Sequence, residues 1–401
     1  MTKAICTSCG GALEVDSAKD AAICPHCGTP YIVEKAIQQY NTTNHNYINA
    51  KVVNIQAEEK EFEIVDGVLK AYLGQSVSIE IPDSVVQIGK EAFKGCSAIS
   101  EVKIPSSVIE ISEAAFSGCK RLAAAELPPA LKTIGDGAFS GCEGLQTIII
   151  PEGVRTLGSN AFGYCTSLQS VTLPSTLQTA GSELFQHCTS LEEVRFPEGL
   201  RSVEANTFAS CTSLRSVTLP STLETISLRA FDGCTSLQSV TFSGGLKKIM
   251  YQAFRNCTAL REIILPEGLE KLTSSIFIGC SALQKVSLPN SITKLQETFQ
   301  DCVSLSEILL PGNLRELGMR TFSGCAALEK IVIPVSVTVV WSSAFENCQS
   351  LRSITFLGQP KLNGRFERCD HVQELNAPLL WKRKYKDQLP KAHWQIGRAH
   401  V

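Results

Sequence analysis

Apolar and polar residues follow a pattern along this chain that repeats with a fixed period from about residue 62 to residue 375. Cysteines mark the period, because they recur in steps of 23 residues from Cys96 to Cys280. The step shortens to 22 residues before Cys302 and to 21 before Cys369. Each of these cysteines has a phenylalanine three residues before it. Apolar residues follow at the third, sixth and eighth positions after most of them, and a proline usually comes next.

Each unit of this period predicts a short strand and a turn. Residues 170–173 (Ser-Val-Thr-Leu) alternate polar and apolar side chains, which is typical of a strand with one buried face. The proline that follows ends the strand because it cannot donate a hydrogen bond. Residues 135–142 (Gly-Asp-Gly-Ala-Phe-Ser-Gly-Cys) predict a turn with a short helical piece. One such unit cannot bury its apolar face alone, so we expect the units to stack around a shared core.

The recurring motif Ala-Phe-x-x-Cys-x-x-Leu-x-x-Val-x-Leu-Pro resembles the leucine-rich repeats of the BspA-like type over residues 62–375. The lead-in at residues 62–69 is similar to the segment that precedes the first full repeat in that family. The resemblance implies a repeat solenoid, that is, a curved, parallel-stranded array of about 12 repeats of 23 residues. It also implies a protein that binds other macromolecules, since members of the family mostly do so, and many are secreted or surface-attached adhesins.

The thirteen repeat cysteines occupy one recurring inward position, where a thiol behaves as a small apolar side chain. Stacking would bring neighbouring cysteines within roughly 5 Å, but with parallel side chains, which is poor geometry for a disulfide. We therefore expect free, unreactive thiols and a reducing compartment. No charged segment followed by an apolar stretch opens the chain, so a secretory signal is not expected. Both observations predict a cytoplasmic protein.

The other four cysteines form two C-x2-C pairs that are separated by fourteen residues: Cys6, Cys9, Cys24 and Cys27. Thiolates at this spacing close a tetrahedral site, which predicts one structural Zn²⁺ per chain. Residues 12–15 and 21–23 predict short strands between the pairs, and residues 1–33 resemble a zinc ribbon. Iron in a rubredoxin-like site is the alternative, and His26 is expected to be a bystander. The module has few basic residues, Lys3 and Lys19, which weighs against nucleic acid as its ligand.

Two further segments complete the organisation of the chain. Residues 34–61 are polar and predict a linker, with a possible capping strand at residues 50–55. Residues 376–401 form a basic tail that predicts either a capping helix over the last repeat or a docking site for an acidic partner. No apolar run approaches the roughly 18 residues of a membrane-spanning segment.

The function predicted from these features is that of a non-catalytic protein-protein interaction scaffold with an unidentified protein partner. Phosphate loops, dinucleotide glycine patterns and H-E-x-x-H motifs are absent from the sequence, so neither an enzyme nor a small-molecule substrate is expected. An exported adhesin and a nucleic-acid regulator acting through the ribbon are the alternatives. Outward positions on the predicted strands are candidates for the binding surface: Ile149, Thr172, Thr218, Thr241, Ile264, Leu309 and Val332. These residues could equally be present only because they favour strands.

Overall fold

The computed structural model describes residues 2–5, 12–15, 21–27, 30–32 and 61–388, except residues 243, 365, 367, 370 and 386. The chain divides into two compact units, residues 1–59 and 60–401, and each is described by itself. The linker and capping strand predicted at residues 34–61 lie outside the described residues, apart from Glu61.

The first unit contains two antiparallel hairpins. Strand β1 (Thr2–Ile5) pairs with β2 (Ala12–Val15), and β3 (Ala21–Ile23) pairs with β4 (Pro30–Ile32). The strands predicted at residues 12–15 and 21–23 are therefore present. Each C-x2-C pair falls in the sequence between the two strands of one hairpin.

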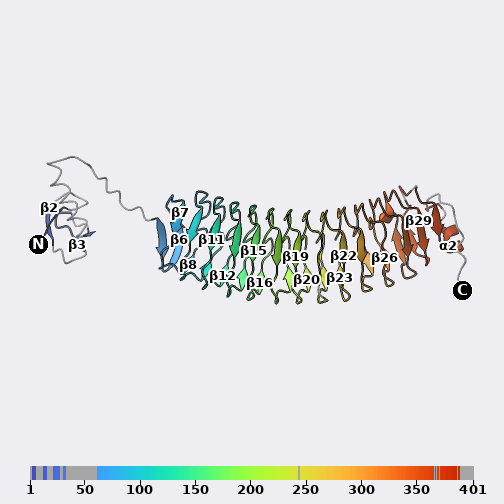
Figure 1. Ribbon diagram of the computed structural model, residues 1–401, viewed down its shortest axis with the longest axis horizontal. Coiled ribbons are helices and arrows are strands. Elements are labelled where there is room, and N and C mark those ends of the chain that lie inside the picture. The colour runs from blue at the N-terminus through green and yellow to red at the C-terminus, as the bar shows by residue number, and fades with distance from the viewer. Residues whose placement is uncertain are drawn as a thin grey trace. The chain divides into compact units, whose positions relative to one another are not determined.

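The second unit is a parallel-stranded solenoid, as the sequence period predicted (Figure 1). It has about 13 turns, whereas about 12 repeats were expected. The turns are here called rungs, and most of them carry a strand on each of two faces. The strands of the long-strand face are β7 (Ser78–Glu80), β9 (Glu101–Lys103), β11 (Ala124–Glu126), β13 (Thr147–Ile149), β15 (Ser170–Thr172), β17 (Glu193–Arg195), β19 (Ser216–Thr218), β22 (Glu262–Ile264), β24 (Lys285–Ser287), β27 (Lys330–Ile333), β29 (Ser353–Phe356) and β31 (Glu374–Asn376).

The short-strand face follows about nine residues later in each rung. Its strands are β8 (Gln87–Ile88), β10 (Glu110–Ile111), β12 (Thr133–Ile134), β14 (Thr156–Leu157), β16 (Thr179–Ala180), β18 (Ser202–Val203), β20 (Thr225–Ile226), β21 (Lys248–Ile249), β23 (Lys271–Leu272), β25 (Lys294–Leu295), β26 (Glu316–Leu317), β28 (Val339–Trp341) and β30 (Lys361–Asn363). Where neighbouring strands on either face pair, they do so in parallel, because the same position recurs one rung later.

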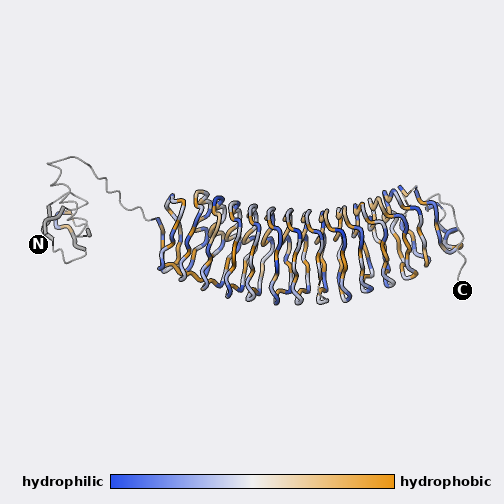
Figure 2. Tube along the Cα trace, viewed as in Figure 1, coloured by the Kyte–Doolittle hydropathy of each residue, from blue (hydrophilic) through white to orange (hydrophobic). Residues whose placement is uncertain are grey.

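The core of the solenoid repeats from rung to rung, as the alternation of apolar and polar segments along the tube shows (Figure 2). The repeat phenylalanines stack in one column from Phe93 to Phe366, with ring centroids 4.8 to 6.0 Å apart and nearly parallel rings. Tyr72 extends this column at the N-terminal end, at 5.4 Å from Phe93. Twelve of these phenylalanines are completely buried, so the stack is the centre of the unit.

The third side of each rung is a series of turns, and the short helical piece expected at residues 135–142 is absent there. Among the described residues, one rung contains a helical turn in this place, the 3-10 helix η1 (Ser342–Phe345). The reason is a pair of left-handed residues in most rungs, such as Gly137 and Gly141 with φ of 59° and 71°. A residue with positive φ cannot continue a right-handed helix. The second of these positions is the residue before the cysteine.

Both ends of the solenoid are covered. The antiparallel hairpin of β5 (Phe62–Val65) and β6 (Val68–Tyr72) precedes the first rung, and β6 pairs in parallel with β8. Helix α2 (Leu379–Lys384) follows the last rung. Its Trp381 packs against Phe356 at 4.6 Å between ring centroids and donates a hydrogen bond from Nε1 to the carbonyl oxygen of Pro360 at 2.6 Å.

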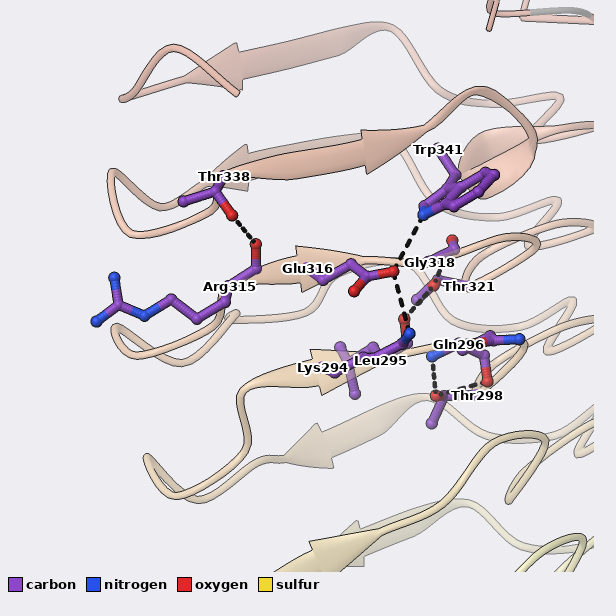
Figure 3. A network of polar contacts seen from close by, with 10 residues as sticks. All are labelled: Lys294, Leu295, Gln296, Thr298, Arg315, Glu316, Gly318, Thr321, Thr338 and Trp341. Atoms are coloured by element: carbon purple, nitrogen blue, oxygen red, sulfur yellow. Dashed lines mark hydrogen bonds and ion pairs between the residues drawn. The ribbon is translucent and has the colours of Figure 1, made fainter. Parts of the chain in front are cut away.

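The 22-residue repeat keeps the strand register, because the missing residue lies between Leu295 and Phe299 in the turn. Buried threonines occupy the position where most rungs have alanine. Thr321 Oγ1 lies 3.1 Å from the carbonyl oxygen of Leu295 and 2.9 Å from that of Gly318 (Figure 3). Thr298 Oγ1 similarly accepts a hydrogen bond from the amide of Gln296 at 3.1 Å. Side-chain hydroxyls therefore satisfy backbone groups around the shortened turn.

Candidate functional site

The candidate binding residues all lie on the long-strand face, and all are exposed. The strands of this face present their first and third residues to solvent and bury the second, because successive side chains point to opposite sides of a strand. Four of the candidates are apolar and remain largely accessible: Ile149 at 70%, Ile264 at 61%, Leu309 at 85% and Val332 at 47%. Thr172, Thr218 and Thr241 form the polar part of the same column.

Among the described residues, two rungs of the long-strand face have no named strand: the rung of Thr241, which has only an isolated bridge to Thr218, and the rung of Leu309. Strand β24 pairs only with β22, and β27 pairs only with β29, so residues 307–309 between them belong to no strand. The core positions of this rung and its neighbour are also less buried. Val286 and Ile308 are half-buried, whereas the equivalent residues of most other rungs are buried.

An open depression of about 400 Å³ lies at the interruption of strand pairing at residues 307–309. Leu309 and Val332 form part of its lining, whereas Ile264 lies outside it. Its complete lining is Gln284, Lys285, Val286, Glu307, Ile308, Leu309, Lys330, Ile331 and Val332. The structure thus brings two of the candidate residues together with partly exposed core residues and three charged side chains.

A second depression, of about 650 Å³, lies nearer the N-terminal end of the same face. Thr172 and Thr218 line it together with Glu193 and Arg195 of β17. It occurs where β15 and β17 share only one register pair, Ser170 with Glu193. Its walls are richer in hydroxyl and charged groups than those of the first depression, so it would suit a more polar ligand.

The repeat cysteines are buried thiols, and burial suppresses their ionisation. It raises the pKa of Cys119 to about 12 and that of Cys348 to about 12, and it places the pKa of Cys188 and Cys211 well above the ordinary value. The reactive form of cysteine is the thiolate. The column therefore offers neither a nucleophile nor a metal ligand near neutral pH, and the described residues contain no disulfide.

A sulfur hydrogen bond that the sequence reasoning missed runs along this column. From Cys119 onward, each Sγ donates to the carbonyl oxygen of the phenylalanine one rung earlier, at 3.0 to 3.3 Å. For example, the oxygen of Phe93 accepts both the amide of Cys96 and the thiol of Cys119. The donor cysteine and the acceptor phenylalanine are 26 residues apart in most rungs. This constant spacing is the feature of the sequence from which the hydrogen bond could have been predicted.

A stacked aromatic pair was also missed. Tyr164 and His187 occupy the position before the cysteine in consecutive rungs, with φ of 61° and 58°. Their rings lie 4.8 Å apart and nearly parallel. Most other rungs have glycine, asparagine or aspartate at this position, and these tolerate a left-handed backbone more readily.

The predicted metal site is only partly within the described residues. Cys24 is buried at the end of β3, Cys27 is exposed in the turn that follows, and Cys6 and Cys9 lie outside the described residues. The amide of His26 donates to the sulfur of Cys24 at 3.4 Å, which is an arrangement that stabilises a thiolate. Within the described ranges, no three histidine, cysteine or carboxylate side chains gather into a possible metal site. No helix in those ranges is long and apolar enough to cross a membrane.

Stacked 23-residue turns with leucine and phenylalanine at fixed inward positions define the class of protein, a leucine-rich-repeat solenoid. The chain belongs to the BspA type leucine-rich repeat family, whose model matches residues 71–192, 178–299 and 296–380.

A solved structure shows the same fold. A leucine-rich repeat protein from Bacteroides ovatus ATCC 8483 is 31% identical, with a TM-score of 0.73 over 80% of this chain and 84% of the other. A leucine-rich repeat protein from T. pallidum is 29% identical, with a TM-score of 0.42 over 51% of this chain and 90% of the other. No curated protein matches the chain.

Proposed function

We propose that this protein is a non-catalytic scaffold that binds a protein partner through the long-strand face of its solenoid. The observation that carries the proposal is the exposure of Leu309 and Val332 beside the open depression. Contiguous exposed apolar side chains rimmed by polar ones mark interaction sites. The BspA type family consists typically of binding scaffolds, which agrees with this assignment.

The proposal includes one structural Zn²⁺, bound by Cys6, Cys9, Cys24 and Cys27. The hairpins of the first unit support it, since each C-x2-C pair connects two paired strands. The amide hydrogen bond to Cys24 suits a thiolate. When bound, the metal would link the two hairpins, which contain too few residues to bury a core.

We also propose that the protein works in a reducing compartment, the cytoplasm. The support is the column of buried thiols that donate hydrogen bonds instead of pairing into disulfides. An adhesin would be found at the cell surface, so fractionation of the native cells separates the two roles. Recovery of the protein from the surface fraction would refute the cytoplasmic assignment.

Affinity capture from a lysate of the native cells tests the binding surface. We expect Leu309→Lys and Ile264→Lys to lose a protein that the wild-type chain captures, because a lysine at either position places an unpaired charge in the apolar part of the face. Ile109→Lys is the matched control, since it adds the same charge at an exposed isoleucine that lies outside the long-strand face. Capture that is unchanged in both test variants would contradict the proposed surface.

A further inference from the structure

Four exposed residues of alternating charge follow one another on the long-strand face around its interruption at residues 307–309. They occupy the same position in consecutive rungs: Glu262, Lys285, Glu307 and Lys330. None of them forms an ion pair with another described residue. Residues one rung apart can do so, because Lys103 pairs with Glu80 on the same face. These four charges are thus available to an outside partner.

This order of charges, Glu-Lys-Glu-Lys, is complementary to its own reverse, because each glutamate then lies opposite a lysine. Two copies that meet face to face about a two-fold axis parallel to the strands would have their rungs in opposite order. Such an axis keeps each column of side chains opposite the same column of the other copy. If it passes between the rungs of Lys285 and Glu307, these two residues face each other across the interface. Glu262 then faces Lys330, and each pairing occurs twice by symmetry.

Other positions of the axis fit less well. An axis through the rung of Lys285 would place that lysine opposite itself, and an axis through Glu307 would do the same for the glutamate. Moving the axis one rung toward the C-terminus would place Glu262 opposite Glu374. Moving it one rung toward the N-terminus would leave only one kind of lysine–glutamate pair. Like charges that face each other across an interface oppose association.

The apolar column agrees with the same axis. Ile264 would face Val332, and Leu309 would face Ser287 of the second copy. Leu309 is the most exposed of the large apolar side chains on this face, and the depression beside Ser287 has partly exposed Val286 in its lining. The protruding leucine of each copy would therefore enter the depression of the other. One rung farther out, Ser239 would face Ser353, which brings no charge into conflict.

We propose that the C-terminal half of the long-strand face binds a second copy of this chain in antiparallel order, with the two-fold axis between Lys285 and Glu307. This inference rests on the proposed function insofar as it takes the same face as a binding surface. The overlap covers eight rungs, from β19 to β31, or about 35 Å at the spacing of parallel strands. A strip of this size is small for a stable dimer, so we expect a dissociation constant on the order of micromolar.

Sedimentation of the full-length protein over about 1 to 500 µM at low salt tests the inference. The wild-type chain should dimerise with rising concentration. Lys285→Glu would place a glutamate opposite Glu307, and Glu307→Lys would place a lysine opposite Lys285. Each single change should weaken the dimer by at least about tenfold. An equimolar mixture of the two variants should form a mixed dimer within about threefold of wild-type affinity, because the charges are again complementary.

Glu193→Lys is the control for Glu307→Lys. It makes the same charge change in the same column, but its rung lies beyond the proposed overlap, so its dimer should be unchanged. A wild-type chain that stays monomeric throughout, or a mixture that associates no better than its components, would overturn the inference. If the chain is monomeric but Leu309→Lys still abolishes capture of another protein, self-association fails while the proposed scaffold function stands.

Discussion

Each repeat cysteine of the inner rungs fills a small apolar space and donates its S–H to a backbone oxygen one rung earlier. The phenylalanine oxygen that accepts it also accepts an amide from its own rung, so both of its lone pairs are used. A thiol suits this place because it is compact, weakly polar and able to donate. At the scale of single residues, burial and this contact together keep the column protonated.

Thiol labelling mapped by mass spectrometry checks this protonation. In the native protein at about pH 8, we expect the buried cysteines, Cys119 to Cys348, to remain unlabelled, because the thiolate is the reactive form. A raised pKa means that labelling increases only as the pH rises toward about 12, the value for Cys119. Half-buried Cys96 should be the first repeat cysteine to react. After denaturation all thirteen should react, and rapid native labelling of Cys211 would contradict the prediction.

At the scale of elements, strands of two to four residues are too short to be stable alone. Their stability comes from the rungs on either side, so each element depends mainly on its nearest neighbours. The last rung has a neighbour on one side only, and helix α2 covers the other. Trp381 makes this contact through its ring and its hydrogen bond to Pro360.

Trp381→Ala should therefore loosen the C-terminal rungs specifically. Replacing a buried tryptophan with alanine lowers the free energy of unfolding by about 3 to 5 kcal/mol. Here the loss of stability should be confined to the last few rungs. Hydrogen exchange should accelerate at residues 353–376 and stay unchanged near residues 202–226. Leu380→Ala in the same helix is the matched control, because that side chain is exposed and should have little effect. Equal acceleration along the whole solenoid would show that the rungs unfold as one block.

At the scale of the whole molecule, the two compact units have separate means of stabilisation. The solenoid has a continuous apolar core, whereas the first unit consists of short hairpins and four cysteines with metal-binding spacing. All four of those cysteines fall within residues 1–59. Loss of metal should consequently affect one unit and not the other.

Metal analysis of the purified native chain should find about one zinc per molecule, as a four-thiolate site requires. Cys24→Ser should release it, while Cys96→Ser should retain it. A chelator should remove the metal without shifting the unfolding transition of the solenoid. A chain that contains no metal when purified under reducing conditions would refute the zinc site, and iron in its place would indicate the rubredoxin-like alternative.

The sequence alone determined the solenoid, the place of the strand on the long-strand face, the inward phenylalanines and cysteines, and the outward columns of that face; the second strand of the rungs, on the short-strand face, was not predicted. It could do so because stacking makes position within the repeat equivalent to position in space. Only the tertiary structure decided that residues 135–142 form turns, since two left-handed residues exclude a helix there. It also decided that strand pairing fails at residues 307–309, because pairing depends on distances between rungs that no residue specifies alone. Together with the depression that it lines, that interruption distinguishes Leu309 from the outward residues of the paired strands.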